Sequence, residues 1–187
     1  MNKSELRQQM KAYRLSLDKD ERKSLDMKIA DRLLKLIEPY DTVLCYVSSD
    51  IEVDTRYILC KLFSDSSKTV LAPKCVKGTN VMHFYPIKGF DDLEKGCFSI
   101  DEPKEGIAAQ TVFSDKSCCI VPALCYDTQG YRVGFGKGFY DRFLAGFNGV
   151  KIGICYSGCI VESIDCDETD IKTDIYVTDK GISYIHK

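Results

Sequence analysis

The chain of 187 residues has a mass of 21.1 kDa and a hydrophobic content of 44%, values that predict a single globular domain over residues 1–187. Its 26 basic and 28 acidic residues leave a net charge of −2, which excludes a general electrostatic attraction to nucleic acid or to a membrane surface. The N-terminal residues are charged and no apolar run is long enough to cross a membrane. We therefore expect a cytoplasmic protein without a membrane or nucleic-acid partner, and we expect it to act as a monomer.

The ten cysteines have the spacing of buried thiols rather than that of a metal site. Most lie within apolar stretches, where a thiol behaves as a small hydrophobic group, and no Cys-x-x-Cys pair occurs. Cys155, Cys159 and Cys166 form the nearest approach to a cluster, at loose spacing. Reduced thiols are expected.

Two helices are predicted at the N-terminal end. The first begins at Asn2, and apolar residues at helical spacing follow it: Leu6, Met10, Tyr13 and Leu17. The second follows Asp18 and ends near Pro39, because proline cannot continue a helix.

Beyond residue 41 the hydrophobic pattern changes to that of strands alternating with helices. Strands are predicted at 42–47, 68–72, 81–85, 118–125, 150–156, 175–177 and 182–185, helices at 55–64 and 138–146, and irregular chain from 86 to 110. The last two strands are expected to form a hairpin. This alternation predicts a three-layer α/β/α domain with a mostly parallel sheet, joined to the N-terminal helical pair.

A glycine-rich loop at 130–141 has the composition of an anion site. It follows the apolar run 119–125, precedes a helix, and contains four glycines, two basic residues and Asp141. Glycines let backbone N–H groups close around phosphate oxygens. Lys137 can neutralise a phosphate, and Asp141 is placed to hold Mg²⁺. The loop is expected to bind a phosphate or a nucleotide, although a tight strand-to-helix turn without a ligand is the structural alternative.

The loop matches neither of the two commonest phosphate motifs. A Walker A sequence needs a hydroxyl residue after the lysine, and Lys137 is followed by Gly138. The dinucleotide fingerprint needs a third glycine where Phe139 stands.

The first helix carries a basic stripe at spacings of four, four and three: Lys3, Arg7, Lys11 and Arg14. These cations share one helix face. The stripe is either a solvated basic face or a clamp in which Lys3 and Arg7 reach triphosphate oxygens.

Acidic residues offer two further candidate contacts. Glu52 follows the first strand, beside Asp54 and Thr55, which suit a helix N-cap. Because Glu52 has no capping role, it is free either to accept hydrogen bonds from a ligand with adjacent N–H groups or to face solvent. Some of the many acids between 162 and 179 could share Mg²⁺ with Asp141.

The long segment 121–143 carries a resemblance to a known family. It reads Val-Pro-Ala-Leu-Cys-Tyr-Asp-Thr-Gln-Gly-Tyr-Arg-Val-Gly-Phe-Gly-Lys-Gly-Phe-Tyr-Asp-Arg-Phe, and it resembles the signature of the 5-formyltetrahydrofolate cyclo-ligases, also called 5,10-methenyltetrahydrofolate synthetases. Weaker matches occur in the same order at 3–7, 52–55 and 170–178. The similarity covers nearly the whole chain.

The resemblance implies a role for each matching residue. ATP would be bound by Lys3, Arg7, Arg132, Val133, Gly134, Phe135, Gly136, Lys137, Gly138, Phe139 and Tyr140. The reduced folate would be bound by Val47 and Glu52 together with Phe135, Gly136, Lys137, Gly138 and Phe139. Asp141 and Asp170 would hold Mg²⁺, with Asp174 as the alternative second carboxylate, and Lys137 would be the catalytic cation.

The implied reaction is the ATP-dependent cyclisation of 5-formyltetrahydrofolate to 5,10-methenyltetrahydrofolate through phosphorylation of the formyl oxygen, with release of ADP and phosphate. Two positions depart from the family pattern: Phe135 stands where many members have arginine, and Phe139 replaces a frequent tyrosine. Thr169 likewise stands where histidine is common. A different class remains open on the residues alone, namely a phosphate-ester-binding sensor or a sugar-phosphate enzyme on a related α/β fold.

Overall fold

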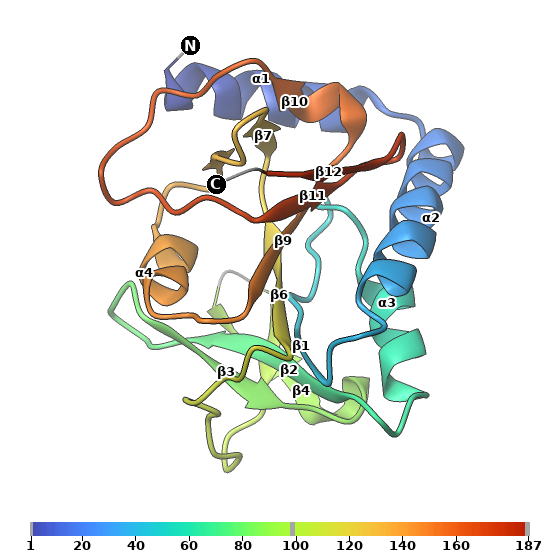
Figure 1. The fold of residues 1–187 in the computed structure, drawn as a ribbon, viewed down its shortest axis with the longest axis vertical. Coiled ribbons are helices and arrows are strands. Elements are labelled where there is room, and N and C mark those ends of the chain that lie inside the picture. Colours follow the sequence, from blue (N-terminus) through green and yellow to red (C-terminus); the bar gives the residue numbers. More distant parts are fainter. Residues whose placement is uncertain (1, 98–99, 186–187) are drawn as a thin grey trace.

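The computed structural model describes residues 2–97 and 100–185, arranged as helices around a central sheet (Figure 1). The helices are α1 (Lys3–Ser16), α2 (Lys19–Leu36), α3 (Arg56–Phe63) and α4 (Phe139–Ala145). Asn2 caps α1 by accepting from the N–H groups of Ser4 and Glu5, and Asp18 caps α2 in the same way. Both predicted helix starts are confirmed.

The main sheet has seven strands in the order β12-β11-β9-β6-β1-β2-β3. Their bounds are β1 (Thr42–Leu44), β2 (Thr69–Cys75), β3 (Met82–Pro86), β6 (Ser117–Pro122), β9 (Val150–Ile154), β11 (Ile175–Val177) and β12 (Ile182–Tyr184). Neighbouring strands from β2 through β11 pair in parallel, and β3 and β12 are antiparallel at the two edges. The mostly parallel sheet and the final hairpin are confirmed.

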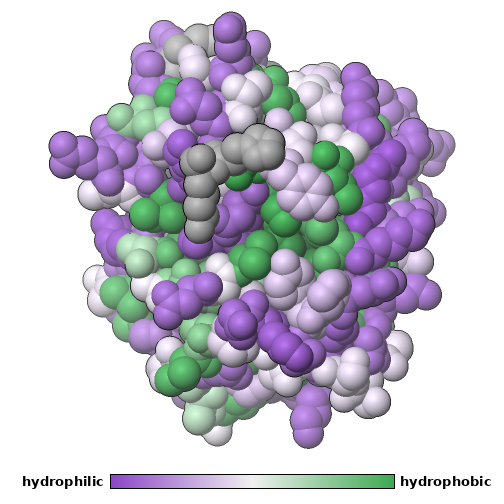
Figure 2. Space-filling view, in the orientation of Figure 1, coloured by the Kyte–Doolittle hydropathy of each residue, from purple (hydrophilic) through white to green (hydrophobic). Residues whose placement is uncertain are grey.

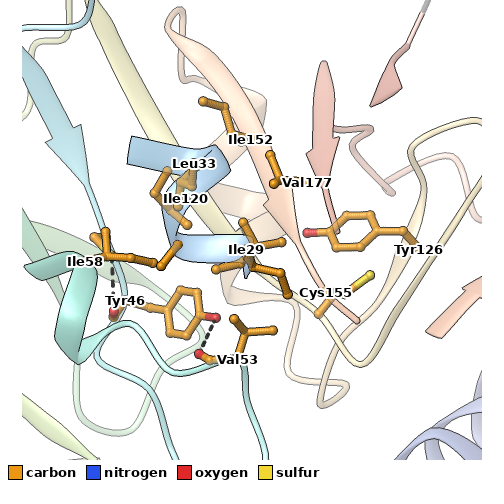
Figure 3. Close-up of a cluster of buried hydrophobic side chains, with 14 of the residues drawn as sticks. Ile29, Leu33, Tyr46, Val53, Ile58, Ile120, Tyr126, Ile152, Cys155 and Val177 are labelled. Carbon is orange, nitrogen blue, oxygen red and sulfur yellow. Dashed lines mark hydrogen bonds between the residues drawn. The ribbon is translucent and has the colours of Figure 1, made fainter. Parts of the chain in front are cut away.

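Helices cover both faces of this sheet, which gives the predicted three layers. α2 and α3 pack on one face, where Ile29 and Leu33 lie among Ile120, Ile152 and Val177 (Figure 3). α4 packs on the other face over a smaller cluster: Leu44, Leu71, Met82, Phe84, Cys119, Val121, Leu144 and Phe147. α1 lies across the end of the molecule toward which β6 and β9 run (Figure 1). The N-terminal helices thus reach the carboxyl ends of the parallel strands, where α/β sheets bind ligands.

Two smaller sheets depart from the predicted elements. The predicted strand 118–125 divides after Pro122, which has no N–H for the ladder. The chain then forms β7 (Cys125–Asp127), which pairs with β8 (Arg132–Val133) and with β10 (Ile160–Val161). The expectation of irregular chain from 86 to 110 is wrong in part, because β4 (Leu93–Lys95) and β5 (Asp101–Pro103) form a short antiparallel pair.

The predicted strand 42–47 is also shorter in the structure. Its ladder extends one residue past β1, where Cys45 donates to the carbonyl of Leu71, and then ends. The carbonyl of Tyr46 instead accepts from the Thr55 hydroxyl at 2.8 Å, which turns the chain toward the loop that contains Glu52.

The molecular surface is largely hydrophilic on the face shown in Figure 2, and the cysteines are free thiols, as the sequence predicts. On the face shown in Figure 2, hydrophilic side chains cover the margin along α2, and apolar ones show between them toward the middle. All ten cysteines are free thiols, and six of them are buried. In the part of the chain that the structure describes, no helix is both long and apolar enough to span a bilayer.

Candidate active site

The glycine-rich loop leaves β8 and enters α4 through left-handed backbone. Gly136 has φ +90° and Gly138 has φ +68°, values that favour glycine over residues with a side chain. A Cβ atom at Gly136 would lie 3.3 Å from the guanidinium carbon of Arg7. The glycine therefore serves both the turn and the close approach of α1.

The basic stripe of α1 runs from exposed Lys11, through half-buried Lys3 and Arg7, to buried Arg14. Nε of Arg7 donates to the carbonyl of Gly134 at 2.9 Å, and the Lys11 ammonium lies 5.5 Å from the centre of the Phe135 ring. Arg14 is only 2% exposed. These contacts place the helix along the glycine-rich loop. The clamp on triphosphate oxygens stays a prediction.

Lys3 joins α1 to the acidic segment 162–174. Its ammonium group donates to Oδ2 of Asp167 at 2.7 Å and also to Oδ2 of Asp170. Burial lowers the pKa of Lys3, but the hydrogen bonds to the two carboxylates outweigh burial and leave that pKa raised. Lys3 stays charged, and one of its partners is a predicted metal ligand.

Asp141 contacts the backbone of the residue that follows Asp170, although 29 positions separate the two aspartates in the sequence. Oδ1 of Asp141 accepts from the N–H of Ile171, the residue after Asp170, at 3.3 Å. The same oxygen accepts from Nη2 of Arg132 at 2.7 Å, and Nη1 of Arg132 donates to the carbonyl of Ile171. Arg132, 8% exposed, thus fixes the two segments together. The phosphate contact implied for it stays a prediction.

The two carboxylates have oxygens left for a ligand. Oδ2 of Asp141 and Oδ1 of Asp170 accept no hydrogen bond from the described residues. Asp174 is held in a similar way, because its Oδ2 atom accepts from the backbone N–H of Lys151 at 2.8 Å and lies 3.7 Å from the Lys151 ammonium group. Over residues 2–97 and 100–185 no set of three metal-ligating side chains gathers, so a cation here would need further oxygens from phosphates and water.

Glu52 is 6% exposed and held by its own loop. The N–H and the hydroxyl of Ser49 both donate to its Oε2 atom at 2.8 Å. Its second oxygen, Oε1, accepts no hydrogen bond within the described chain. A carboxyl group with one oriented oxygen and one available oxygen suits a ligand that presents N–H donors.

Tyr140 lies between the glycine-rich loop and the Glu52 loop. Its hydroxyl oxygen is buried and has no hydrogen-bond partner among the described residues. Burial raises the pKa of Tyr140 well above its usual value, and the Cys119 thiol and the Glu52 carboxylate raise it further. The hydroxyl is therefore a protonated donor close to Glu52. Val47, 3% exposed, belongs to the core beside this loop.

The tip of the loop is open to solvent. Lys137 is exposed, and its ammonium group makes no ion pair or hydrogen bond with any described residue, while its carbonyl accepts from Arg142 at 3.0 Å. Phe135 is 46% exposed. The cation predicted to be catalytic is thus available to an incoming ligand.

The model of the 5-formyltetrahydrofolate cyclo-ligase family matches residues 1–179. The chain belongs to this family. Relatives include a probable 5-formyltetrahydrofolate cyclo-ligase of Caenorhabditis elegans, 27% identical over 92% of this chain and 90% of the relative. The 5-formyltetrahydrofolate cyclo-ligase of Mycoplasma pneumoniae is 27% identical over 96% of this chain and 100% of the relative.

Solved structures agree with the family assignment. The 5,10-methenyltetrahydrofolate synthetase of Aquifex aeolicus has a TM-score of 0.83 and 32% identity over 100% of this chain and 94% of its own. The synthetase of Mycoplasma pneumoniae has a TM-score of 0.73 and 26% identity over 96% of this chain and 99% of its own. The resemblance noted from the sequence is confirmed, and the sensor and sugar-phosphate alternatives are not supported.

Several residues of this cyclo-ligase site are missing from the sequence-based predictions. Ser49 is one, although its position three residues before Glu52 repeats the Ser-x-x-Glu spacing of a reciprocal cap. Arg22 is another: it donates to the carbonyl of Glu52 from α2, and no local pattern indicates this. Asp167 shares Lys3 with Asp170 and is indistinguishable in the sequence from the other acids of the tail.

Proposed function

We propose that the protein converts 5-formyltetrahydrofolate to 5,10-methenyltetrahydrofolate, with ATP as co-substrate and with ADP and phosphate as products. The observation that carries this proposal is the position of α1. Arg7 bonds the glycine-rich loop at Gly134, and Arg14 bonds the carbonyl of Ile51 beside Glu52 at 2.9 Å. One helix therefore contacts both a phosphate-binding type of loop and a loop suited to a donor-rich heterocycle.

ATP is assigned to the basic side of this site. Lys3, Arg7 and Lys137 supply positive charge, and the backbone of 132–140 supplies N–H donors around the phosphates. Because Lys137 is exposed and unpaired among the described residues, it can turn toward the transferred phosphoryl group without breaking a native contact. We assign it the neutralisation of charge that develops during transfer.

Mg²⁺ fits the residues present, since Asp141 and Asp170 each keep a carboxylate oxygen available and the Asp141 carboxylate contacts Ile171, the residue next to Asp170. When bound, Mg²⁺ would add positive charge against the phosphate oxygens. Asp170 is favoured over Asp174 because Asp141 accepts a hydrogen bond from Ile171, the residue next to Asp170. Lys3 would then be shared between Asp170 and the phosphates.

The folate is assigned to the Glu52 side. Glu52 would accept hydrogen bonds from adjacent N–H groups of the pterin, with Val47 in the wall behind it. The Tyr140 hydroxyl, buried and without a protein partner in the described chain, is a donor for a polar atom of the bound substrate. Phe135 through Phe139 would lie between the two substrates and contact both.

The chemistry follows from bringing two substrates together. A formyl-amide oxygen is a poor leaving group, so transfer of the γ-phosphoryl group of ATP to that oxygen activates it. The N10 atom of the same folate then attacks the formyl carbon and loses its proton to the solvent, and phosphate leaves as the methenyl bridge forms. The protein positions the reactants and neutralises charge rather than forming a covalent bond with them. A monomeric, cytoplasmic enzyme is part of the same proposal.

The direct test combines the protein with Mg-ATP and 5-formyltetrahydrofolate and follows the near-UV absorbance of the methenyl product. We expect product only when ATP is present. The variant Glu52→Gln should raise the KM for the folate and leave the KM for ATP nearly unchanged, with the exposed Glu105→Gln as the matched control. Absence of product from the wild-type protein in the presence of ATP would refute the proposed activity.

A further inference from the structure

Two arginines that have no assigned contact with either substrate hold the backbone of the Glu52 loop. Nη1 of Arg14 donates to the carbonyl of Ile51 at 2.9 Å, and Nη2 of Arg22 donates to the carbonyl of Glu52 at 2.7 Å. Arg14 lies in the last turns of α1, and Arg22 lies in the first turns of α2. Side chains from the corner between α1 and α2 therefore bind the carbonyls of two consecutive residues, Ile51 and Glu52.

Arg14 also reaches a second segment of the site. Its Nη2 atom donates to the carbonyls of Ala123 at 2.6 Å and Leu124 at 2.9 Å, where the chain leaves β6 for the strands that lead to the glycine-rich loop. Its Nε atom is buried and has no partner in the described chain. Burying a guanidinium carries a desolvation penalty, and hydrogen bonds to carbonyls offset that penalty less than an ion pair with a carboxylate would. Arg14 is therefore more useful for fixing the geometry of these segments than for stabilising the fold.

Arg22 is itself oriented by a chain of hydrogen bonds. Its Nε atom donates to the Tyr156 hydroxyl at 3.2 Å, and that hydroxyl donates to Oδ1 of Asp26 at 2.8 Å. The same Oδ1 accepts from the N–H of Asp54 at 3.2 Å, two residues beyond Glu52. The backbone is thus held before Glu52 at Ile51 and after it at Asp54. Ser49 orients the Glu52 carboxylate by donating two hydrogen bonds to Oε2.

We propose that Arg14 and Arg22 are positioning residues that set the Glu52 carboxylate for the folate, with Arg22 specific to the folate side and Arg14 common to both substrates. This inference rests on the proposed function, because it assigns Glu52 to the folate. Among the described residues, the Arg22 guanidinium has polar contacts with the Glu52 carbonyl, the Tyr156 hydroxyl and the Asp26 carboxylate. Arg14, in contrast, links the Glu52 loop to α1, which carries Lys3 and Arg7.

The test uses Arg22→Met and Arg22→Lys, with Arg32→Met as the matched control. Arg32 lies on the same helix, and its one side-chain hydrogen bond within residues 2–97 and 100–185 goes to the carbonyl of Lys28 in its own turn. We expect Arg22→Met to raise both the Kd of the folate without ATP and the KM for the folate by about tenfold, the scale of one charge-assisted hydrogen bond. The KM for Mg-ATP should stay within about twofold of wild type, Arg22→Lys should recover part of the loss, and Arg32→Met should change neither constant.

Arg14→Lys, which keeps the buried charge, should raise the KM for both substrates. A folate Kd within about twofold of wild type in Arg22→Met, or equal rises in both KM values, would overturn the inference. If Arg22→Met does not fold, Arg22→Lys provides the same comparison of the two KM values. Wild-type turnover in the same assay separates the two proposals: its absence contradicts the proposed function, whereas turnover with an unaffected Arg22 variant contradicts only the positioning role.

Discussion

Replacement of Arg132 by methionine tests the hydrogen bonds by which Arg132 joins Asp141 to the carbonyl of Ile171, next to Asp170. The side chain of Arg132 is 5% exposed and that of Asp141 is 27% exposed, and their closest atoms lie 2.7 Å apart. Removing one partner of a buried pair costs about 3–5 kcal/mol, and the partial exposure of Asp141 favours the lower end of that range. We therefore expect Arg132→Met to lower the free energy of unfolding by about 3 kcal/mol. For a chain of this size, the corresponding fall in Tm is about 6–12 °C.

Urea denaturation at pH 7 measures this change. Arg56→Met is the matched control, because Arg56 pairs with Asp101 at 2.8 Å but is 48% exposed, and it should cost less than about 1 kcal/mol. Adding Asp141→Asn to Arg132→Met should cost less than Asp141→Asn in the wild type, since the unpaired charge is then already present. A loss below about 1 kcal/mol in Arg132→Met, or strictly additive effects in the cycle, would refute the reasoning.

Three further predictions concern the glycine-rich loop and the ion pairs of Asp101 with Arg56 and Lys95. Lys137→Ala should lower kcat on the order of 100-fold with little change in Tm, and near-normal kcat with saturating substrates would exclude its catalytic role. Gly136→Ala forces a side chain onto φ +90° and against Arg7, so it should cost about 1–2 kcal/mol in urea and raise the KM for ATP; an unchanged KM would show that Arg7 does not bind ATP in this position. The side-chain hydrogen bonds from Lys95 and Arg56 lower the pKa of Asp101 in the folded protein. The ionised Asp101 carboxylate therefore stabilises the fold above its ordinary pKa, and this stabilisation is lost as pH falls through the lower folded-state pKa. Asp101→Asn should accordingly be less stable than wild type at pH 7, by under about 1 kcal/mol, and this difference should shrink as pH falls below about 4; a difference that grows in acid would contradict this.

The elements that the sequence predicts well are those set by local interactions. Asn2 and Asp18 cap their helices because a cap needs only its own side chain and the next three residues. The β4–β5 pair was not predicted because Leu93–Lys95 and Asp101–Pro103 are short and mostly polar, and neither shows a hydrophobic period. The division of 118–125 at Pro122 depends on pairing of β7 with β8 and β10, which local pattern does not contain.

In the candidate site, too, local spacing predicts which residues share a face, and tertiary packing decides which of them meet. Helical spacing puts Lys3, Arg7 and Lys11 on one face of α1, but only the packing of that face against the glycine-rich loop distinguishes it from a solvated one. Among the acids of the tail, Asp170 is singled out by the hydrogen bond between Asp141 and Ile171, a contact between distant segments that no local spacing indicates. Arg22 could not be connected with Glu52 from the sequence, because a side chain on one helix and a carbonyl in a distant loop share no spacing rule.

The amino-acid sequence by itself determined the chemistry of this protein: a loop whose glycines, Arg132 and Lys137 suit phosphate, helices whose caps lie within a few residues, and a signature long enough to indicate the family. These depend on residue identity and on interactions over one or two turns. Only the tertiary structure decided which segments meet. It brought Asp141 beside Asp170, used Arg132 to hold them together, and buried Arg14 between two loops, because the sheet order and the path of α1 place residues far apart in the chain at one end of the parallel strands.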